Sequence, residues 1–364
     1  MSISTLTDAI RIFSGRRLHH PIYLIYFITS QCMGHCRHCF YWDHINQAES
    51  LLSIEEIDKI AASMGRIYQL ILTGGEPFFR EDVADLAERF YIYNNLYHLS
   101  VATSGYHPER VEKAVKILLK KCPGLKITIG LPVEGTETLN DEIRGIQGFY
   151  KRTVETLSRL KKIQQHAPQL NILIDLTISS FNSDRLLEIY DHLLNDLKPD
   201  LINAILTRGN SRDPDAKKID TNEVAKLFAL MEEDIRKGRI KGYGFLSKWL
   251  HAKDIVLRQT ALDIFQNHTY HLPCQAGRTA GVLMPEGDVY ACELREKPIG
   301  NLRAFDYNFP ALWKSENATA IRREILDTRC SCHHQCFLSN TLFWNLKAWP
   351  DIVREWMKIR GRNR

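Results

Sequence analysis

Short apolar runs alternate with longer amphipathic stretches over the first 210 residues of the chain. An apolar run of about 4–8 residues is typical of a buried strand, and apolar residues at helical spacing indicate a helix. The runs predict strands at 22–29, 69–72, 99–103, 126–131, 171–178 and 201–207. The stretches between them predict helices at 54–66, 81–93, 150–166 and 183–197, and a further helix that begins at Pro108. Six strands alternating with helices favour a parallel α/β sheet with right-handed crossovers, curved into a partial barrel.

Local signals fix several of these boundaries. Ser53 and Glu56 form a capping-box pattern, which predicts that a helix begins directly after Ser53. Pro108 suits the first helical position, where its missing N–H has no intrahelical partner to lose. The segment around Gly135 and the Arg144-Gly145 pair is predicted to be a loop.

The pattern changes beyond residue 210. Two charged amphipathic stretches, 221–238 and 249–266, predict helices that connect the barrel to the rest of the chain. Residues 282–292 predict a β-hairpin around a Pro-Glu-Gly-Asp turn, and a helix follows it. We therefore expect a barrel core at 1–210, a helical connector at 211–272, a small hairpin-plus-helix extension at 273–340 and a basic amphipathic helix at 341–364.

Composition narrows the class of protein. The chain has 364 residues, a net charge of +5 and nine cysteines. Three cysteines lie at 32–39, one at 122 and five between 274 and 336, which is unlike a secreted disulfide framework and fits metal sites in a reducing cytoplasm. We see no signal-peptide pattern at residues 1–15 and no apolar stretch of about 18 residues, the length that a membrane span needs. The small net charge, with Lys and Arg dispersed, argues against a nucleic-acid partner or an RNA-modifying role.

The first cysteine group carries the main chemical signal. Cys32, Cys36 and Cys39 are spaced C-x3-C-x2-C directly after the first predicted strand. Loops after strands are where α/β barrels keep their reactive residues. Three thiolates suit an iron–sulfur cluster with one iron left open to an outside ligand. The alternative is a zinc site completed by His35 or His38, and its usual paired C-x2-C spacing is not found here.

A second motif follows the next strand. Gly74-Gly75-Glu76-Pro77 offers backbone that can approach a ligand closely and a carboxylate that can accept from an ammonium group. Alone, such a motif is only a turn. Beside an open iron, it suits a ligand that carries an amine and a carboxylate.

These motifs together resemble the radical S-adenosylmethionine (SAM) superfamily over about residues 22–207. The resemblance implies a TIM-like partial barrel and a [4Fe–4S] cluster held by Cys32, Cys36 and Cys39, whose fourth iron binds SAM. It also implies reductive cleavage of SAM to a 5′-deoxyadenosyl radical, which removes a substrate hydrogen atom.

The same resemblance implies which residues contact SAM. Glu76, with the backbone of Gly74 and Gly75, would hold the SAM amino group, and His38 would pack near the adenine. Ser104 and Arg144 lie where relatives place further SAM contacts. Ordinary alternatives are a turn for Ser104 and a solvated ion pair for Arg144. The fourth strand end, Gly130-Leu-Pro-Val-Glu134-Gly135, departs from the common Ser-Leu-Asp-Gly form.

The C-terminal cysteines resemble the SPASM or twitch extension of radical SAM enzymes. The five candidate ligands are Cys274, Cys292, Cys330, Cys332 and Cys336. Two clusters need about eight thiolates, so we expect one auxiliary [4Fe–4S] cluster. Cys274, Cys292 and Cys336 are expected ligands, with the fourth position open between Cys330 and Cys332. Structural zinc is the alternative, and Cys122 is expected to be a buried apolar residue.

The thiol that remains, Cys330 or Cys332, suggests two outcomes for the reaction. As a hydrogen-atom donor it would make the protein an epimerase. Alternatively, the auxiliary cluster accepts an electron from the substrate radical, and the protein is then an oxidase or a dehydrogenase. Because only about 20 residues precede the first strand, too few for a peptide-recognition domain, we favour a sugar, polyol or lipid-linked substrate. The alternatives are crosslinking or epimerisation of a ribosomal peptide, and a zinc-binding interaction protein that is not an enzyme.

The tail adds possible partners. Residues 337–364 carry six Lys or Arg residues against two acidic ones. From Asp351 onward the pattern predicts an amphipathic basic helix, whose apolar residues include Ile352, Val353, Trp356 and Met357. The simplest interpretation is a docked helix with a solvated basic face, and the alternative is peripheral contact with a membrane or lipid-linked substrate. A flavodoxin or ferredoxin electron donor is acidic and would also fit a basic surface.

Overall fold

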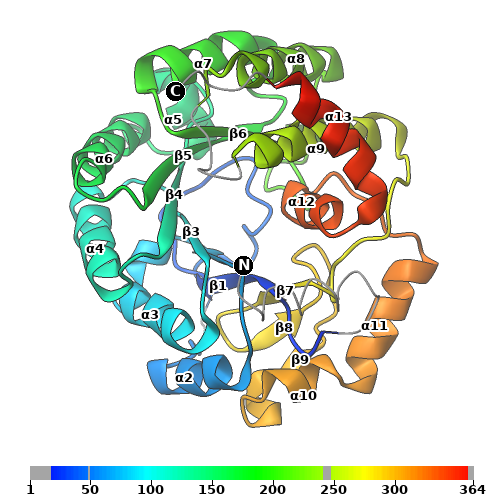
Figure 1. The fold of residues 1–364 in the computed structure, drawn as a ribbon. Helices are drawn as coiled ribbons and strands as arrows, with labels where there is room; N and C mark the ends of the chain where they lie inside the picture. Colours follow the sequence, from blue (N-terminus) through cyan, green and yellow to red (C-terminus); the bar gives the residue numbers. More distant parts are fainter. Residues whose placement is uncertain (1–17, 48–49, 241–246, 360–364) are drawn as a thin grey trace.

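The computed structural model describes residues 18–47, 50–240 and 247–359. One sheet of nine strands runs through it in the order β6-β5-β4-β3-β2-β1-β7-β8-β9. The first six strands along the chain are β1 (Tyr23–Thr29), β2 (Gln69–Gly74), β3 (His98–Ala102), β4 (Lys126–Pro132), β5 (Leu170–Ile178) and β6 (Leu201–Leu206). All six are parallel, and they curve into an open ring (Figure 1). The expected partial (β/α)6 TIM-like barrel is confirmed.

The barrel helices cover the outside of this ring. They are α2 (Ile54–Ser63), α3 (Val83–Asn94), α4 (Pro108–Lys121), α6 (Phe149–Gln164), α7 (Leu186–His192) and α8 (Thr221–Lys237). The capping box at Ser53 and Glu56 forms as expected. The stretch expected to be one helix over 183–197 is divided into a 3₁₀ turn (Ser183–Arg185), α7 and a π-helical turn (Leu193–Leu197). Short 3₁₀ turns also lie at Pro77–Phe79, Pro214–Lys217, Leu302–Phe305 and Leu346–Ala348.

One helix replaces an expected loop. Helix α5 (Glu137–Arg144) ends at Gly145, which adopts the left-handed conformation at φ 71°. The eight residues carry only two apolar positions one helical turn apart, Leu139 and Ile143, which is too little periodicity to recognise in the sequence. This helix is functionally relevant because its last turn lies against the first cysteine loop.

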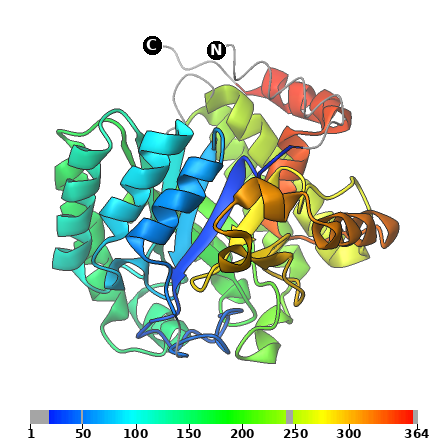
Figure 2. The same cartoon turned by 90° about the horizontal axis from the view of Figure 1, so that it is seen from below.

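The C-terminal hairpin extends the barrel sheet. Strand β7 (Ala280–Leu283) pairs in parallel with β1, so that Tyr23 lies opposite Ala280. Strands β8 (Asp288–Tyr290) and β9 (Gly300–Asn301) then add in antiparallel fashion. Helices α10 (Phe309–Trp313) and α11 (Glu316–Asp327) follow, and the C-terminal helices lie on the opposite side from the barrel helices (Figure 2).

Three helices fill the opening between β6 and β7. They are α9 (Ser247–Asn267), α12 (Gln335–Phe343) and α13 (Trp349–Lys358). Helix α12 bridges the opening directly, because Gln335 Nε2 donates to the carbonyl of Ala204 at 2.9 Å and Asn340 Nδ2 donates to Thr279 Oγ1 at 2.6 Å. Behind it, α9 and α13 share a separate apolar core that includes Ile352. Within the described ranges, no helix is both long and apolar enough to cross a lipid bilayer.

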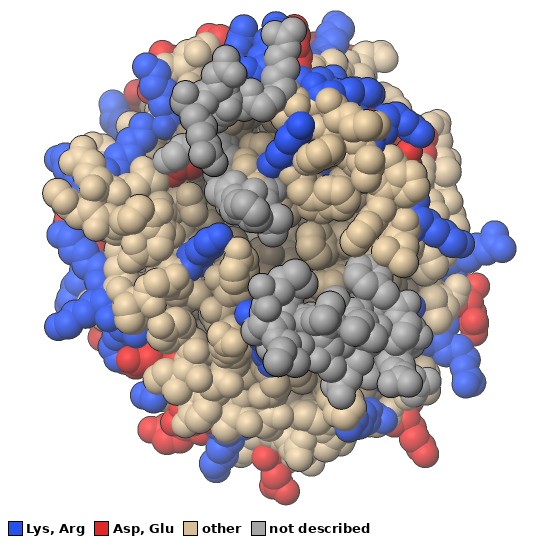
Figure 3. Space-filling model, in the orientation of Figure 1, with Lys and Arg blue, Asp and Glu red and all other residues tan. Residues whose placement is uncertain are grey.

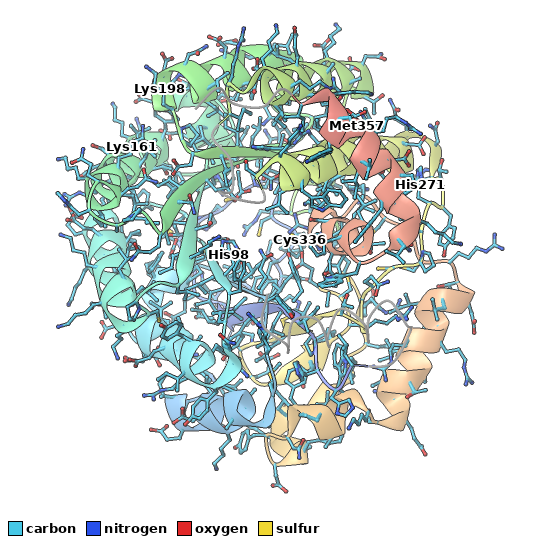
Figure 4. The ribbon with its side chains drawn as sticks, in the orientation of Figure 1. His98, Lys161, Lys198, His271, Cys336 and Met357 are labelled. Atoms are coloured by element: carbon cyan, nitrogen blue, oxygen red, sulfur yellow. The ribbon has the colours of Figure 1, made fainter. Side chains whose placement is uncertain are left out.

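The interior of the ring stays accessible to water. Alternate residues of β2, β3, β5 and β6 are buried against the helices, whereas the residues between them keep partial exposure. The side chains of His98 and Cys336 both lie inside the ring (Figure 4). The space-filling view shows this end of the ring hollowed at its centre, with Lys and Arg spread around the rim (Figure 3). We call this interior the chamber.

An ion pair between residues that are distant in the sequence connects the C-terminal extension to the barrel. Arg303 Nε donates to Glu56 Oε1 at 2.7 Å, and the Tyr307 hydroxyl donates to the same oxygen at 2.8 Å. The hydrogen bond from Arg303 lowers the pKa of Glu56 to about 2. An unfolded glutamate titrates near about 4.3, so this pair contributes stability above that pH and loses it as the pH falls toward 2.

We therefore expect Arg303→Met to lower the free energy of unfolding by about 1–2 kcal/mol at pH 7, because hydrogen bonds to a charged group are lost. Thermal unfolding of the cluster-loaded protein under nitrogen measures this. Arg354→Met is the matched control, since Arg354 pairs with Asp351 at the surface with 65% of its side chain exposed and should change nothing. Equal effects of the two substitutions would contradict the prediction.

Candidate active site inside the barrel

The first cysteine loop leaves β1 and brings its thiols together. A Cβ on Gly34 would lie 3.3 Å from Cys36 Sγ and 3.4 Å from Cys32 Sγ, so both sulfurs converge over this glycine. Backbone amides approach two of the thiols: Gly34 N–H donates to Cys32 Sγ at 3.3 Å, and the amide of Tyr41 bonds to Cys39. Burial raises the pKa of Cys32 to about 12 and that of Cys39 to about 11. Iron supplies the positive charge that converts such buried thiols to ligating thiolates.

The loop is held on two sides. The amides of His35 and Arg37 donate to the carbonyls of Arg144 and Ile143, the last residues of α5. A Cβ on Gly145 would lie 2.9 Å from His35 Cβ, so only glycine permits this close approach. On the other side, the Arg37 guanidinium bonds to Asp213 at 2.8 Å.

Arg144 forms a buried ion pair rather than the solvated one considered from the sequence. Its guanidinium bonds Glu134 through both Nε and Nη2, with Nε at 2.7 Å from Glu134 Oε2. Its Nη1 donates to Cys36 Sγ at 3.4 Å. Glu134 is fully buried, and burial raises its pKa despite the neighbouring cation. Arg144 thus joins the unusual fourth strand end to the cysteine loop.

The Gly-Gly turn brings the ends of β1 and β2 together. A Cβ on Gly74 would lie 2.3 Å from the carbonyl oxygen of Thr29, and one on Gly75 would lie 2.2 Å from that of Gln31. Gly74 also has a φ of 128°, which disfavours any other residue. The amides of Gly75 and Glu76 donate to these same two carbonyls. Both amides are therefore engaged within the chain.

Glu76 is buried and already surrounded by donors. Its Oε1 accepts from Thr103 Oγ1 at 2.7 Å and from the amide of Phe78 at 3.1 Å. Its Oε2 accepts from both the amide and the hydroxyl of Ser104. The Ser104 hydroxyl also lies 3.8 Å from Met33 Sδ, in the cysteine loop. Ser104 therefore links Glu76 to that loop, and both carboxylate oxygens already have partners within the chain.

His38 has an unused ring nitrogen. Its side chain is 9% exposed, and its Nδ1 has no hydrogen-bond partner. Burial, together with the charges of Arg144 and Arg208, lowers its pKa, so the ring is neutral at physiological pH. A buried, unpaired polar atom is normally explained by a missing ligand or water.

Further polar groups line the chamber and were not recognised in the sequence. Asp175 accepts from Asn203 Nδ2 at 3.0 Å, and the Asp175 carboxylate approaches the Cα of Gly130, where a Cβ would lie 2.8 Å from it. Arg208 stacks on Phe40, with its guanidinium carbon 4.5 Å from the ring centroid, and bonds Glu293 at 3.0 Å. Each of these charged residues lies on or just after an apolar strand, and that position was the available signal.

Burial raises the pKa of Asp175 to about 6, although the hydrogen bond from Asn203 opposes the shift. An unfolded aspartate titrates near about 3.9, so the folded protein binds more protons between about pH 4 and 6 and loses stability as the pH rises through this range. Asp175→Asn keeps an oxygen for Asn203 and removes the buried charge. We expect it to raise the free energy of unfolding by about 1–3 kcal/mol at pH 8 and to change little at pH 4.5.

Thermal unfolding of the loaded protein at both pH values measures the effect of Asp175→Asn. The matched control is Asp327→Asn at the exposed end of α11. If Asp175→Asn and the wild type unfold at the same temperature at pH 8, the carboxylate is not destabilising in the folded chain.

The second cysteine group surrounds a pocket. The pocket is small, about 20 Å³, and is lined by Cys274, Cys330 and Cys332 together with apolar residues of α9 and α12. Cys292 is close to the same thiols. The charges of Cys332 and Cys274 contribute to raising its pKa, although burial is the main cause. In the described parts of the chain, no three His, Cys, Asp or Glu side chains are close enough to share one metal ion. This does not argue against a four-iron cluster. Each of its thiolates binds a different iron, so the thiols are farther apart than the ligands of a single metal ion.

A shared hydrogen-bond pattern marks these thiols. The amide of Ala276 donates to Cys274 Sγ at 3.4 Å, and the amide of Leu294 donates to Cys292 Sγ at 3.5 Å. In both cases the amide lies two residues after the cysteine. The amide of His334 approaches Cys332 in the same way. Cys32 and Cys39 have the same pattern in the first group. Hydrogen bonds to sulfur are a normal feature of iron–sulfur ligation.

Cys336 lies in a different environment. It is the second residue of α12, and its hydrogen-bond partner is the hydroxyl of Tyr23. Arg208, Glu293 and Asp175 act on its pKa, which burial raises to about 11. Cys122 is fully buried at the end of α4, apart from both groups.

Two family models match the chain. The model of the radical SAM superfamily matches residues 26–192, and the model of an iron–sulfur cluster-binding domain, SPASM, matches residues 274–337. The two matches contain the first and the second cysteine groups, respectively.

Curated relatives are distant. The pre-heme d1 synthase of Dinoroseobacter shibae is 23% identical over 46% of this chain and 39% of its own length. The GTP 3′,8-cyclase of Limosilactobacillus fermentum is 24% identical, and the match covers 48% of this chain and 51% of that protein. The AdoMet-dependent heme synthase of Methanosarcina barkeri is 23% identical over 83% of this chain and 84% of its own length. The chain thus spans about half or less of the first two relatives.

Solved structures share the fold. The structure of anSMEcpe with bound AdoMet superposes with a TM-score of 0.62 at 16% identity, covering 93% of this chain and 100% of that one. Streptococcus suis SuiB bound to S-adenosylmethionine gives a TM-score of 0.61 at 16% identity, covering 88% of this chain and 70% of SuiB. The cysteine groups, the barrel and the two family matches agree: residues 26–192 of the chain match the radical SAM superfamily, and residues 274–337 match the SPASM iron–sulfur domain.

Proposed function

We propose that this radical SAM enzyme removes a hydrogen atom from a small polar substrate held in the chamber, and then completes an oxidation or an epimerisation. One observation carries the proposal: charged side chains adjoin both cysteine groups and act on the same chamber carboxylate. Arg144 contacts Cys36 at one end, Arg208 and Glu293 lie beside Cys292 at the other, and Asp175 is influenced by both arginines. When bound, the SAM-binding cluster supplies the electron that converts SAM to a 5′-deoxyadenosyl radical.

The residues of the chain then hold and orient the reactants. Cys32, Cys36 and Cys39 would ligate the first cluster, and Arg144 would position the loop that carries them. His38, with its unpaired Nδ1, is a candidate for the adenine contact. Glu76 would serve the SAM amino group through the carbonyl-lined Gly74-Gly75 turn, while Ser104 positions Glu76.

For the auxiliary cluster, the geometry favours a ligand set that differs from the sequence expectation. Cys274, Cys292, Cys330 and Cys332 act on one another electrostatically, and three of them line the same pocket. The sequence expectation made Cys336 a ligand and excluded Cys330 or Cys332. The bond between Cys336 and the Tyr23 hydroxyl supports the set without Cys336.

The chamber lining supports a substrate rich in hydroxyl or similar polar groups. Asp175, Asn203 and Arg208 offer acceptors and donors that a sugar, polyol or lipid-linked sugar would satisfy. A peptide is the second candidate, since SuiB has been crystallised with its precursor peptide SuiA and shares this fold.

Partners and location follow from the surface and the thiols. All nine cysteines are free, which supports a reducing, cytoplasmic location. A flavodoxin or ferredoxin would deliver the electrons. Helix α13 is docked through Ile352, while Trp356 and Met357 remain exposed beside Lys248, so peripheral contact with a lipid surface is retained as a secondary proposal. Residues 360–364 of the basic tail lie outside the described residues.

The test is SAM cleavage by protein loaded with iron and sulfide under nitrogen. We expect brown protein with about eight irons per chain, and 5′-deoxyadenosine on addition of SAM and dithionite. Colourless protein with stoichiometric zinc would favour the zinc-binding alternative. Brown protein that leaves SAM intact would overturn the proposed chemistry.

A further inference from the structure

We propose that the chamber has a second entrance at the N-terminal ends of the barrel strands, through which the neutral, hydroxyl-rich part of an extended substrate enters and is held. This entrance lies at the opposite end of the barrel from the first cysteine group. The inference rests on the proposed function and deepens it, because it names a substrate class and the side from which the substrate arrives.

Two rows of polar side chains cross the sheet in this half of the chamber. The strand register places Gln69 of β2 beside His98 of β3, at the first residues of both strands. One layer further in, Ser100 lies beside Thr128 of β4, and Thr128 lies beside Asn171 of β5. Figure 4 shows His98 inside the ring. The alternation of burial along β2, β3 and β5 directs Gln69, Ser100 and Asn171 to the same side. We call these five residues the polar rows.

The polar rows differ from an ordinary barrel interior. A closed (β/α)8 barrel fills this space with layers of bulky branched side chains. Here Ser100 and Asn171 keep partial exposure, and among the described residues their side chains have no hydrogen-bond partner. The next layer toward the cysteine groups includes Ala102 and Gly130, which leave space rather than fill it. The polar rows therefore line an open part of the chamber.

The polar rows are also uncharged. Burial lowers the pKa of His98 to about 4, so its ring is neutral at physiological pH, and its Nε2 lies 2.8 Å from Thr128 Oγ1. Lys126, whose charge acts on His98, directs its Nζ to the Tyr97 hydroxyl at 2.9 Å. Hydroxyl, amide and neutral imidazole groups both donate and accept hydrogen bonds, as the hydroxyl groups of sugars and polyols do. A neutral ligand rich in hydroxyl groups therefore suits these rows better than an anionic one.

The polar rows lie at an open end of the barrel. Figure 2 shows the starts of the barrel strands at the top of the view and the loop after β1 at the bottom. Figure 3 looks onto the end with the strand starts, which is hollowed at its centre. Along β4, Lys126 lies beside His98 and Pro132 lies beside Asp175. At about 3.3 Å per residue this separation is about 20 Å, so a molecule that reaches from the entrance to Asp175 is extended rather than compact.

Introduced cysteines test the entrance. The cluster-loaded protein with SAM bound is treated with a methanethiosulfonate reagent that carries glucose, and the labelled peptide is measured by mass spectrometry. We expect Ser100→Cys to be labelled as completely as Ser50→Cys, which is exposed on the surface. We expect Val101→Cys to stay unlabelled, because that side chain faces the barrel helices and is fully buried.

A substitution at the first row tests the direction of entry. Adding Gln69→Trp to Ser100→Cys should slow the labelling by more than about 10-fold, because the indole occupies the entrance and a packed interior does not make room for it. Gln165→Trp is the same exchange at an exposed position outside the barrel and should change nothing. Wild-type iron content in each variant shows that the barrel is intact.

Three results would overturn the proposal. Labelling of Ser100→Cys as slow as that of Val101→Cys would show that the interior is filled. Labelling that Gln69→Trp leaves unchanged would place the entrance elsewhere. Labelling by iodoacetamide but not by the glucose reagent would show an opening that admits small molecules and no sugar. None of these measurements depends on cleavage of SAM, so a failure of the proposed function is seen separately.

Discussion

Cys36→Ala should abolish SAM cleavage and remove about four irons per chain, leaving the auxiliary cluster in place. The reason is specific to this loop. Cys36 shares the space over Gly34 with Cys32 and is the thiol that the Arg144 guanidinium contacts. Removing one of only three protein ligands should lower SAM cleavage by more than the ~10–100-fold that is typical of residues that only support a ligand. Iron analysis and 5′-deoxyadenosine formation under nitrogen measure both effects.

Cys122→Ala is the matched control for Cys36→Ala. Cys122 is likewise a free cysteine, but it is fully buried at the end of α4. It should keep all iron and full cleavage activity. If Cys36→Ala retained wild-type iron, the first cysteine group would not hold the SAM-binding cluster, and the zinc interpretation would need a new test.

The barrel could be predicted because its signals are local. Each strand of the parallel sheet is a continuous apolar run, and capping residues such as Ser53 and Pro108 mark helix starts. The pairing of β7 with β1 could not be predicted, since it joins residues more than 250 positions apart and depends on how the barrel closes. Helix α5 was missed because its stability comes from packing against the cysteine loop rather than from its own periodicity.

Some site residues could be predicted from their spacing in the sequence. Others could not, because their role depends on contacts between distant parts of the chain. The spacing of Cys32, Cys36 and Cys39 in one loop indicates a cluster without any structure. For Cys330, Cys332 and Cys336, spacing alone cannot say which thiols meet, because the start of α12 rotates the last one toward Tyr23. Glu76 likewise looks like a free carboxylate in the sequence, yet Thr103 and Ser104 already occupy its oxygens.

Arg144→Met should lower the free energy of unfolding by about 3–5 kcal/mol at neutral pH, because it leaves the carboxylate of Glu134 buried without its cationic partner. Cleavage of SAM should fall by about 10–100-fold, since Arg144 also supports Cys36. Burial already raises the pKa of Glu134, so without Arg144 its protonated form becomes the stable one in the folded chain. The folded pKa then lies above the unfolded one, and the stability defect should shrink as the pH falls.

Two comparisons identify the buried charge as the cause. Adding Glu134→Gln to Arg144→Met removes the uncompensated carboxylate and should recover most of the stability, though not the contact to Cys36. Arg159→Met is the matched surface control, because Arg159 also bonds several carboxylates but has 31% of its side chain exposed, against 11% for Arg144. It should cost only about 0–1 kcal/mol. Thermal unfolding of the loaded variants between pH 6 and 8 measures all three, and equal losses for Arg159→Met and Arg144→Met would show that burial is not what makes this ion pair matter.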